Sequence, residues 1–168
     1  MGRQTLEEIF DYDFILFSIN SVYPDYKICY LINSSLGIQM QKEPPVELQN
    51  KTHRGLLQFS MFQYYDEETF LNYELISNRS FNSVSSISKK DKKEIRQIDL
   101  FGQEEEANQE IGFLIPELEK TDFLFIIRTE TDPNTILDLE SSLKKINEIT
   151  NLRFIKPDDL DSKKNLIF

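Results

Sequence analysis

The chain has one cysteine and one histidine among its 168 residues, and no tryptophan. A single cysteine, Cys29, excludes an intrachain disulfide, and this scarcity fits a reducing cytoplasm. Together, Cys29 and His53 supply too few ligands for a zinc site and too few partners for a Cys-His catalytic pair. We expect His53 to be a solvated loop residue and Cys29 to be a packed, inert thiol. No catalytic residue, metal or other cofactor is predicted.

Glycine and basic residues are also scarce. The five glycines are not spaced as in the phosphate-binding patterns GxGxxG or GxxxxGK. Lys and Arg number 19 against 29 Asp and Glu, which gives a net charge of −10. Because phosphate contacts depend on clustered Lys and Arg, this charge argues against a nucleic-acid partner.

Long apolar runs are missing. No stretch approaches the roughly 18 apolar residues that span a bilayer, and the N-terminus is acidic where a secretory signal is basic and apolar. These features predict a soluble cytoplasmic protein with no membrane partner. Hydrophobic residues still make up 39% of the chain, with 13 Phe and 7 Tyr, so a core is expected. The length favours a single domain over residues 1–168.

Apolar periodicity indicates six strands and two helices. The helices are expected to begin near Pro24-Asp25, with Gly37 as C-cap, and at Asp132-Pro133, with Asn151 at the end. Glu43-Pro44-Pro45 is expected to lie outside any regular element. The predicted strands cover 14–19, 38–41, 57–61, 71–75, 123–127 and 152–155.

The order of these elements predicts the fold class. We expect an α+β fold of two layers, with two helices on one face of a mixed, mainly antiparallel sheet. The strand at 152–155 is expected to run parallel to 123–127 after a right-handed crossover. Residues 77–110 lack an apolar period, and we interpret them as a mobile excursion around 80–110 within the domain. The pattern Asn78-Arg79-Ser80 within them matches a glycosylation acceptor and is interpreted as accidental.

Residues 115–123 read I-P-E-x-x-x-T-D-F. This segment resembles the motif of the IPExxxVDY family, small proteins of Bacteroidetes bacteria, and residues 11–40 are similar to that family's opening strand and helix. Thr121 stands where the motif has Val, and Phe123 where it has Tyr. Since Phe123 has no hydroxyl, phenol chemistry is excluded at this position. The resemblance implies no particular reaction.

The motif carries two carboxylates, Glu117 and Asp122. In one interpretation Glu117 accepts backbone N–H groups at a turn that Pro116 starts, while Asp122 caps the strand entry or pairs with Lys120. In the other, the two acids bind a metal ion or act as acid and base. We favour the structural interpretation for all the motif residues, namely Ile115, Pro116, Glu117, Thr121, Asp122 and Phe123.

One further segment suggests a partner. Residues Gln97, Ile98, Asp99, Leu100 and Phe101 resemble the QL(S/D)LF peptide through which bacterial proteins bind the replication sliding clamp. A Gln amide would fix the register while Leu100 and Phe101 fill an apolar pocket. The alternative is that the apolar residues pin this segment to the core, and we expect that outcome.

We therefore expect a non-catalytic cytoplasmic interaction or scaffold module, of unknown partner and oligomeric state. The alternative is a small-molecule-binding or carboxylate-based enzymatic domain. A sliding-clamp-associated protein is a narrower alternative.

Overall fold

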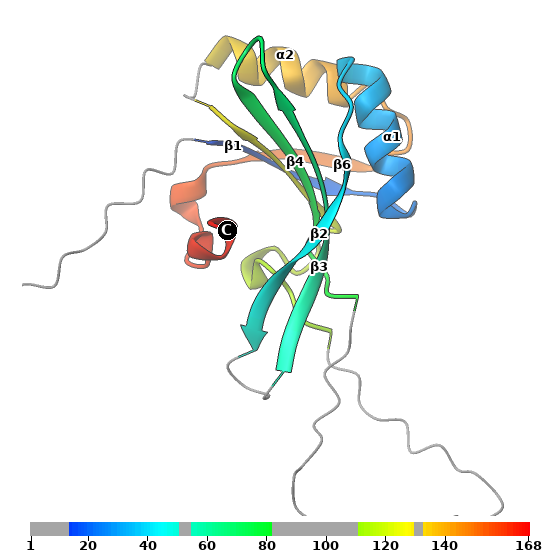
Figure 1. The fold of residues 1–168 in the computed structure, drawn as a ribbon. Helices are drawn as coiled ribbons and strands as arrows, with labels where there is room; N and C mark the ends of the chain where they lie inside the picture. Colours follow the sequence, from blue (N-terminus) through cyan, green and yellow to red (C-terminus); the bar gives the residue numbers. More distant parts are fainter. Residues whose placement is uncertain (1–13, 51–54, 82–110, 130–132) are drawn as a thin grey trace, which may run out of the picture.

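The structure is a computed structural model that describes residues 14–50, 55–81, 111–129 and 133–168 (Figure 1). His53, Asp132 and the segment 97–101 lie outside these ranges, as does most of the predicted excursion. The described elements are β1 (Phe14–Asn20), α1 (Asp25–Leu36), β2 (Gln41–Asn50), β3 (Gly55–Asp66), β4 (Leu71–Ser77), β5 (Phe123–Arg128), α2 (Pro133–Leu143) and β6 (Asn151–Ile155), with short 3₁₀ turns η1 (Pro116–Leu118), η2 (Pro157–Asp159) and η3 (Lys163–Leu166).

The six strands of the described residues form one sheet, in the order β2-β3-β4-β5-β1-β6. Every neighbouring pair is antiparallel, which confirms the α+β class. The described sheet is thus fully antiparallel rather than mixed, because β1 separates the two strands that were expected to run in parallel. Because β5 and β6 both run antiparallel to β1, they point in the same direction, as predicted for 123–127 and 152–155. They do not pair with each other, since β1 lies between them.

β2 differs from its prediction. The expectation of a strand at 38–41, with Glu43-Pro44-Pro45 outside regular structure, was wrong, because β2 runs from 41 to 50 through both prolines. Its pairing with β3 shifts register between Glu43 and Val46, which marks a bulge. Proline has no N–H to donate, so it is tolerated in a strand at an edge or a bulge, and β2 provides both.

The helix ends follow local sequence signals more closely. Gly37 has φ 70° and its N–H donates to the Asn33 carbonyl at 2.8 Å, which is the predicted C-cap of α1. α2 begins at Pro133, but it ends at Leu143 rather than near Asn151. From Leu143 the chain continues in hydrogen-bonded turns, and Asn151 opens β6.

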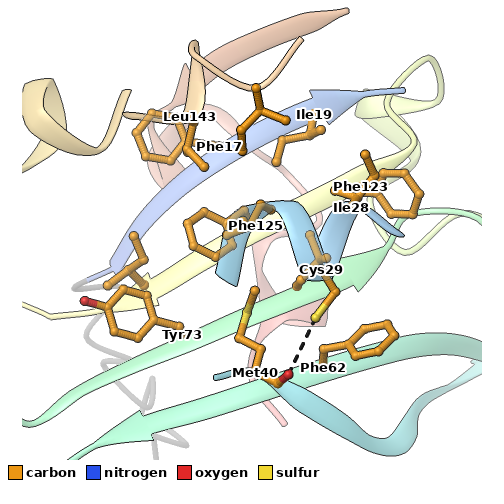
Figure 2. Packing of buried hydrophobic residues seen from close by; sticks show 14 of the residues in the cluster. Phe17, Ile19, Ile28, Cys29, Met40, Phe62, Tyr73, Phe123, Phe125 and Leu143 are labelled. Carbon is orange, nitrogen blue, oxygen red and sulfur yellow. Dashed lines mark hydrogen bonds between the residues drawn. The ribbon is translucent and has the colours of Figure 1, made fainter. Parts of the chain in front are cut away.

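α1 and α2 both pack on one face of the sheet, as expected (Figure 1). Figure 2 shows this core, where Phe17 and Phe125 of the sheet meet Ile28 of α1 and Leu143 of α2. Phe17 also packs edge-on against Phe154 of β6, with ring centroids 5.9 Å apart.

The opposite face carries a second core, which residues 156–168, the C-terminal segment, close. Leu16, Phe59 and Ile76 point to this side and are covered by Leu160 and Leu166. Figure 1 shows the segment, in red, on the side of the sheet away from the helices. Because both pleat faces are covered, β1 and β5 are apolar at nearly every position. Among the described residues, no helix has the length and apolar character needed to cross a membrane.

Candidate functional site

The family-like motif forms the turn that leads into β5. Ile115, Thr121 and Phe123 are buried, while Pro116 and Glu117 are exposed. Pro116 is the first residue of η1, the position its fixed φ and missing N–H favour. The motif therefore alternates between residues packed inward and residues at the surface.

Asn78 lies at the centre of this turn and is completely buried. Its Oδ1 accepts the N–H of Ile115 at 2.8 Å. Its Nδ2 donates to three backbone carbonyls, those of Leu118 at 2.7 Å, Thr121 at 3.3 Å and Ile115 at 3.4 Å. One side-chain amide thus satisfies backbone groups along the whole motif.

The backbone of Asn78 binds the same turn from both ends. Its N–H donates to the Asp122 carbonyl and its carbonyl accepts from Leu114 N–H, both at 2.9 Å. Sequence reasoning missed this role and noticed Asn78 only as a glycosylation pattern. Since the amide is fully buried and engaged, the folded protein does not present it for glycosylation.

Asp122 ties the motif to the end of β1. Its Oδ2 accepts the Ser21 N–H at 3.1 Å and an N–H of the Asn20 amide at 3.3 Å. Arg79 Nη2 lies 3.7 Å from its Oδ1. Asp122 makes no ion pair with Lys120 among the described residues; the Lys120 carbonyl instead accepts a hydrogen bond from Asn20.

Glu117 binds a different segment. Its carboxylate accepts the Ser162 N–H at 2.6 Å, which links η1 to the C-terminal segment. Burial pushes the pKa of Glu117 upward, but backbone N–H groups at Glu117, Ser162 and Asp161 outweigh this effect and hold the pKa below its usual value. Glu117 and Asp122 therefore serve separate contacts. Across the described ranges, no group of three His, Cys, Asp or Glu residues could hold a metal ion.

A cleft of about 450 Å³ opens beside the motif. Its apolar wall comes from β2, β3 and the chain before η1, and its polar wall comes from the C-terminal segment. The lining residues are Leu48, Gln49, Leu57, Ile111, Gly112, Phe113, Pro116, Asp161, Ser162, Lys164 and Asn165.

A buried ion pair holds the C-terminal segment from the other side. Glu74 is 2% exposed and is bound by the Arg128 guanidinium through two bonds of 2.8 and 2.9 Å. Burial raises the pKa of Glu74, against the opposing effect of Arg128. Arg128 Nη2 also donates to the Leu166 carbonyl at 2.9 Å. The sheet thereby fixes the chain end by a charged hydrogen bond.

Asp25, Lys42 and Ser60 form a third polar cluster. Lys42 Nζ lies 3.1 Å from Asp25 Oδ2, and the Ser60 hydroxyl bonds to both. Burial raises the pKa of Asp25, but hydrogen bonds from Ser60, Lys42 and Tyr26 outweigh it and leave the pKa low. A nucleophilic serine requires a neighbouring base that can accept its proton. Asp25 is paired with Lys42 and has a low pKa, so it is a poor base for Ser60. The cluster anchors the start of α1 to β2 and β3.

Cys29 is buried, with its Sγ 3.7 Å from the Met40 carbonyl (Figure 2). Desolvation raises its thiol pKa to about 11, and the nearby Asp25 adds to the effect. A thiol of this pKa is almost wholly protonated at neutral pH and is a poor nucleophile.

The outer side of α1 and the turn before it carry exposed aromatic residues. Tyr26 and Tyr30 are 67% and 68% exposed and lie one helical turn apart. Val22 is 86% exposed, and Tyr23 is partly exposed with Lys27 Nζ 3.6 Å from its ring centroid. We call Val22, Tyr23, Tyr26 and Tyr30 the tyrosine stripe. The sequence analysis predicted the bounds of this helix but drew no inference from its outer side.

The fold and its site define an α+β protein with one antiparallel sheet, in which the buried Asn78 organises the turn before β5 and charged contacts fasten the C-terminal segment. A scan against protein-family models and searches of curated proteins and solved structures found no match to this chain.

Proposed function

We propose that this protein is a non-catalytic interaction module of the bacterial cytoplasm that binds a protein partner through the tyrosine stripe. The observation that supports this proposal most directly is the exposure of Tyr26 and Tyr30 on one side of α1. Membership of the IPExxxVDY family rests on the sequence motif and belongs to the same proposal.

Exposed tyrosines in a row are suited to protein recognition. Tyrosine loses little conformational freedom on binding, offers a large apolar ring and keeps a hydroxyl for a hydrogen bond. Aromatic residues are also enriched among those that dominate binding energies. The helix holds the rings of Tyr26 and Tyr30 in a defined spacing, because residues four apart lie on the same side.

The test is affinity capture after crosslinking in the native bacterial cell, with identification by mass spectrometry. We expect one dominant protein with the wild-type chain and its loss with Tyr26→Ala/Tyr30→Ala, since truncating such anchors costs about 2 kcal/mol each. The matched control is Tyr65→Ala/Leu137→Ala, which removes two exposed apolar side chains elsewhere. Equal recovery of the partner with both variants would contradict the proposal.

A small-molecule-binding domain is the second candidate, favoured by the cleft beside the motif. Its volume of about 450 Å³ and its apolar wall facing a polar one resemble ligand sites in other proteins. Native mass spectrometry of protein purified from its host should then show a bound metabolite, and Leu48→Trp should reduce its occupancy. A metabolite unaffected by Leu48→Trp would place the ligand elsewhere.

A further inference from the structure

The two edges of the sheet are protected to different degrees. β2 forms one edge and carries Pro44, Pro45 and a bulge, features that prevent a further strand from pairing. β6 forms the other edge, with the sequence NLRFI. It contains neither proline nor a bulge, and its register with β1 is continuous.

The backbone groups on the open side of β6 follow from that register. Thr150 N–H donates to the Asn20 carbonyl at 2.9 Å, whereas the Ile19 carbonyl accepts from Asp122 on the β5 side. Since alternate residues of a strand direct their backbone groups to opposite neighbours, the even-numbered residues of β1 face β6.

In register, those even-numbered residues lie opposite Asn151, Arg153 and Ile155. Leu152 and Phe154 therefore direct their N–H and C=O groups away from β1. Among the described residues, no hydrogen bond outside the sheet uses these groups. The side chains of Leu152 and Phe154 are only partly buried at the rim of the helix-side core.

The strand and the residue after it carry positive charge within an acidic chain. Residues 144–156 contain four basic residues and one acidic residue, and the acidic residues Asp158 and Asp159 follow in η2. Lys144 pairs with Glu140, while Lys145, Arg153 and Lys156 are exposed and make no ion pair within the described ranges. An extended segment beside β6 would place its carboxylates near Arg153 and Lys156.

We infer that the open edge of β6 is a second binding surface, which takes an acidic, extended segment of a partner protein as an added antiparallel or parallel strand. The backbone N–H and C=O groups of Leu152 and Phe154 supply the main-chain hydrogen bonds, and the positive charges of Arg153 and Lys156 favour carboxylates. This surface shares no residue with the tyrosine stripe, so each can be tested without the other. Two such surfaces would let the protein hold two partners together.

In the test, a short acetylated peptide in which valine alternates with glutamate is titrated into the full chain. The chemical shifts of the protein's backbone amides are followed by NMR. We expect the largest shifts at the amides of Leu152 and Phe154. The counterpart peptide with lysine in place of glutamate should bind at least about tenfold more weakly, and added salt should weaken the glutamate peptide.

Two variants test separately the contributions of the backbone hydrogen bonds and of the positive charge to peptide binding. Leu152→Pro removes an N–H that faces away from β1 and should abolish binding of the glutamate peptide. Arg153→Glu/Lys156→Glu leaves the backbone intact and should weaken binding at least about tenfold. The control Lys120→Glu reverses one charge at another exposed lysine and should have little effect, whereas Arg153→Glu alone should weaken binding. If Leu152→Pro fails to fold, the charge variants alone decide.

Several results would overturn the proposal. They are equal affinity for the two peptides, shifts confined to other elements, and no binding at millimolar peptide. A concentration-dependent dimer in analytical ultracentrifugation that Leu152→Pro dissociates would show that a second copy of the chain occupies this edge instead.

Discussion

A single amide, that of Asn78, replaces the regular hydrogen bonding that the motif turn lacks. Buried backbone groups outside a helix or sheet need another partner, and Asn78 provides both a donor and an acceptor. The main structural determinant of the motif thus lies outside it, close to forty residues earlier in the chain.

Replacing Asn78 should therefore be costly. Asn78→Ala leaves the Ile115 N–H and the Leu118 carbonyl buried without a partner, so we expect the free energy of unfolding to fall by about 2–4 kcal/mol. Chemical denaturation provides the measurement. Asn147→Ala, at an exposed position, should change it by less than about 0.5 kcal/mol. Similar changes in the free energy of unfolding for the two variants would show that the Asn78 side chain does not stabilise the turn.

Glu117 should make stability depend on acidic pH. Its pKa in the folded protein lies below the usual 4.5, so its contribution is present above that pH and is lost as the pH falls through the folded value. Glu117→Gln keeps the shape but not the charge and should reduce stability by at most about 1 kcal/mol at neutral pH, since solvent screens an exposed carboxylate. The wild type and the variant should converge in strong acid. A constant difference across the pH range would show that charge plays no part.

Cys29 should be unreactive in the folded protein. With a pKa of about 11, roughly one thiol in ten thousand is ionised at pH 7, and the sulfur is buried as well. A colorimetric thiol reagent should label the chain only as fast as it unfolds, and at once in denaturant. Rapid labelling under native conditions would indicate that α1 opens readily from the sheet.

Among the elements, the β3–β4 hairpin contains the one described non-glycine residue with positive φ. Phe70 has φ 59°, a strained conformation for a non-glycine residue. Its side chain is 75% exposed, so little apolar burial offsets the strain. We expect Phe70→Gly to raise the free energy of unfolding by about 0.5–1 kcal/mol, because relief of strain exceeds the added unfolded-chain entropy. Phe81→Gly, also exposed, has no such strain and should not stabilise the protein. Thermal melts of the two variants would distinguish them.

The sequence predicted those elements whose ends depend on local residues. It did not predict features that depend on contacts with residues distant in the sequence. Gly37 and Pro133 mark helix ends through their own backbone chemistry, so the sequence alone suffices. β2 was misjudged because the tolerance of Pro44 and Pro45 depends on its place at the sheet edge. The role of Asn78 depends on contacts with the distant motif, which no local pattern indicates. The placement of the motif turn was predictable, but the residue at its centre was not.

At the scale of the whole molecule, the C-terminal segment acts as the cover of the second core. Leu166 is fully buried there, whereas Ile167 is 39% exposed. Leu166→Ala should lower the free energy of unfolding by about 2–4 kcal/mol through lost burial and an unfilled cavity. Ile167→Ala should cost less than about 1 kcal/mol. Equal effects, measured by denaturant titration, would mean that the segment packs loosely on the sheet.

The position of β1 in the sheet also governs when the protein can fold. β1 lies between β5 and β6, and Phe17 pairs with both Phe125 and Phe154. During synthesis, β1 leaves the ribosome long before either neighbour exists, with apolar residues on both faces. Long-range pairing of this kind slows folding, because a large loop must close before the contacts form. β5 emerges first and can pair with one edge of β1, whereas the other edge stays unpaired until β6 follows. An apolar strand left unpaired during synthesis is the kind of surface on which nascent chains aggregate.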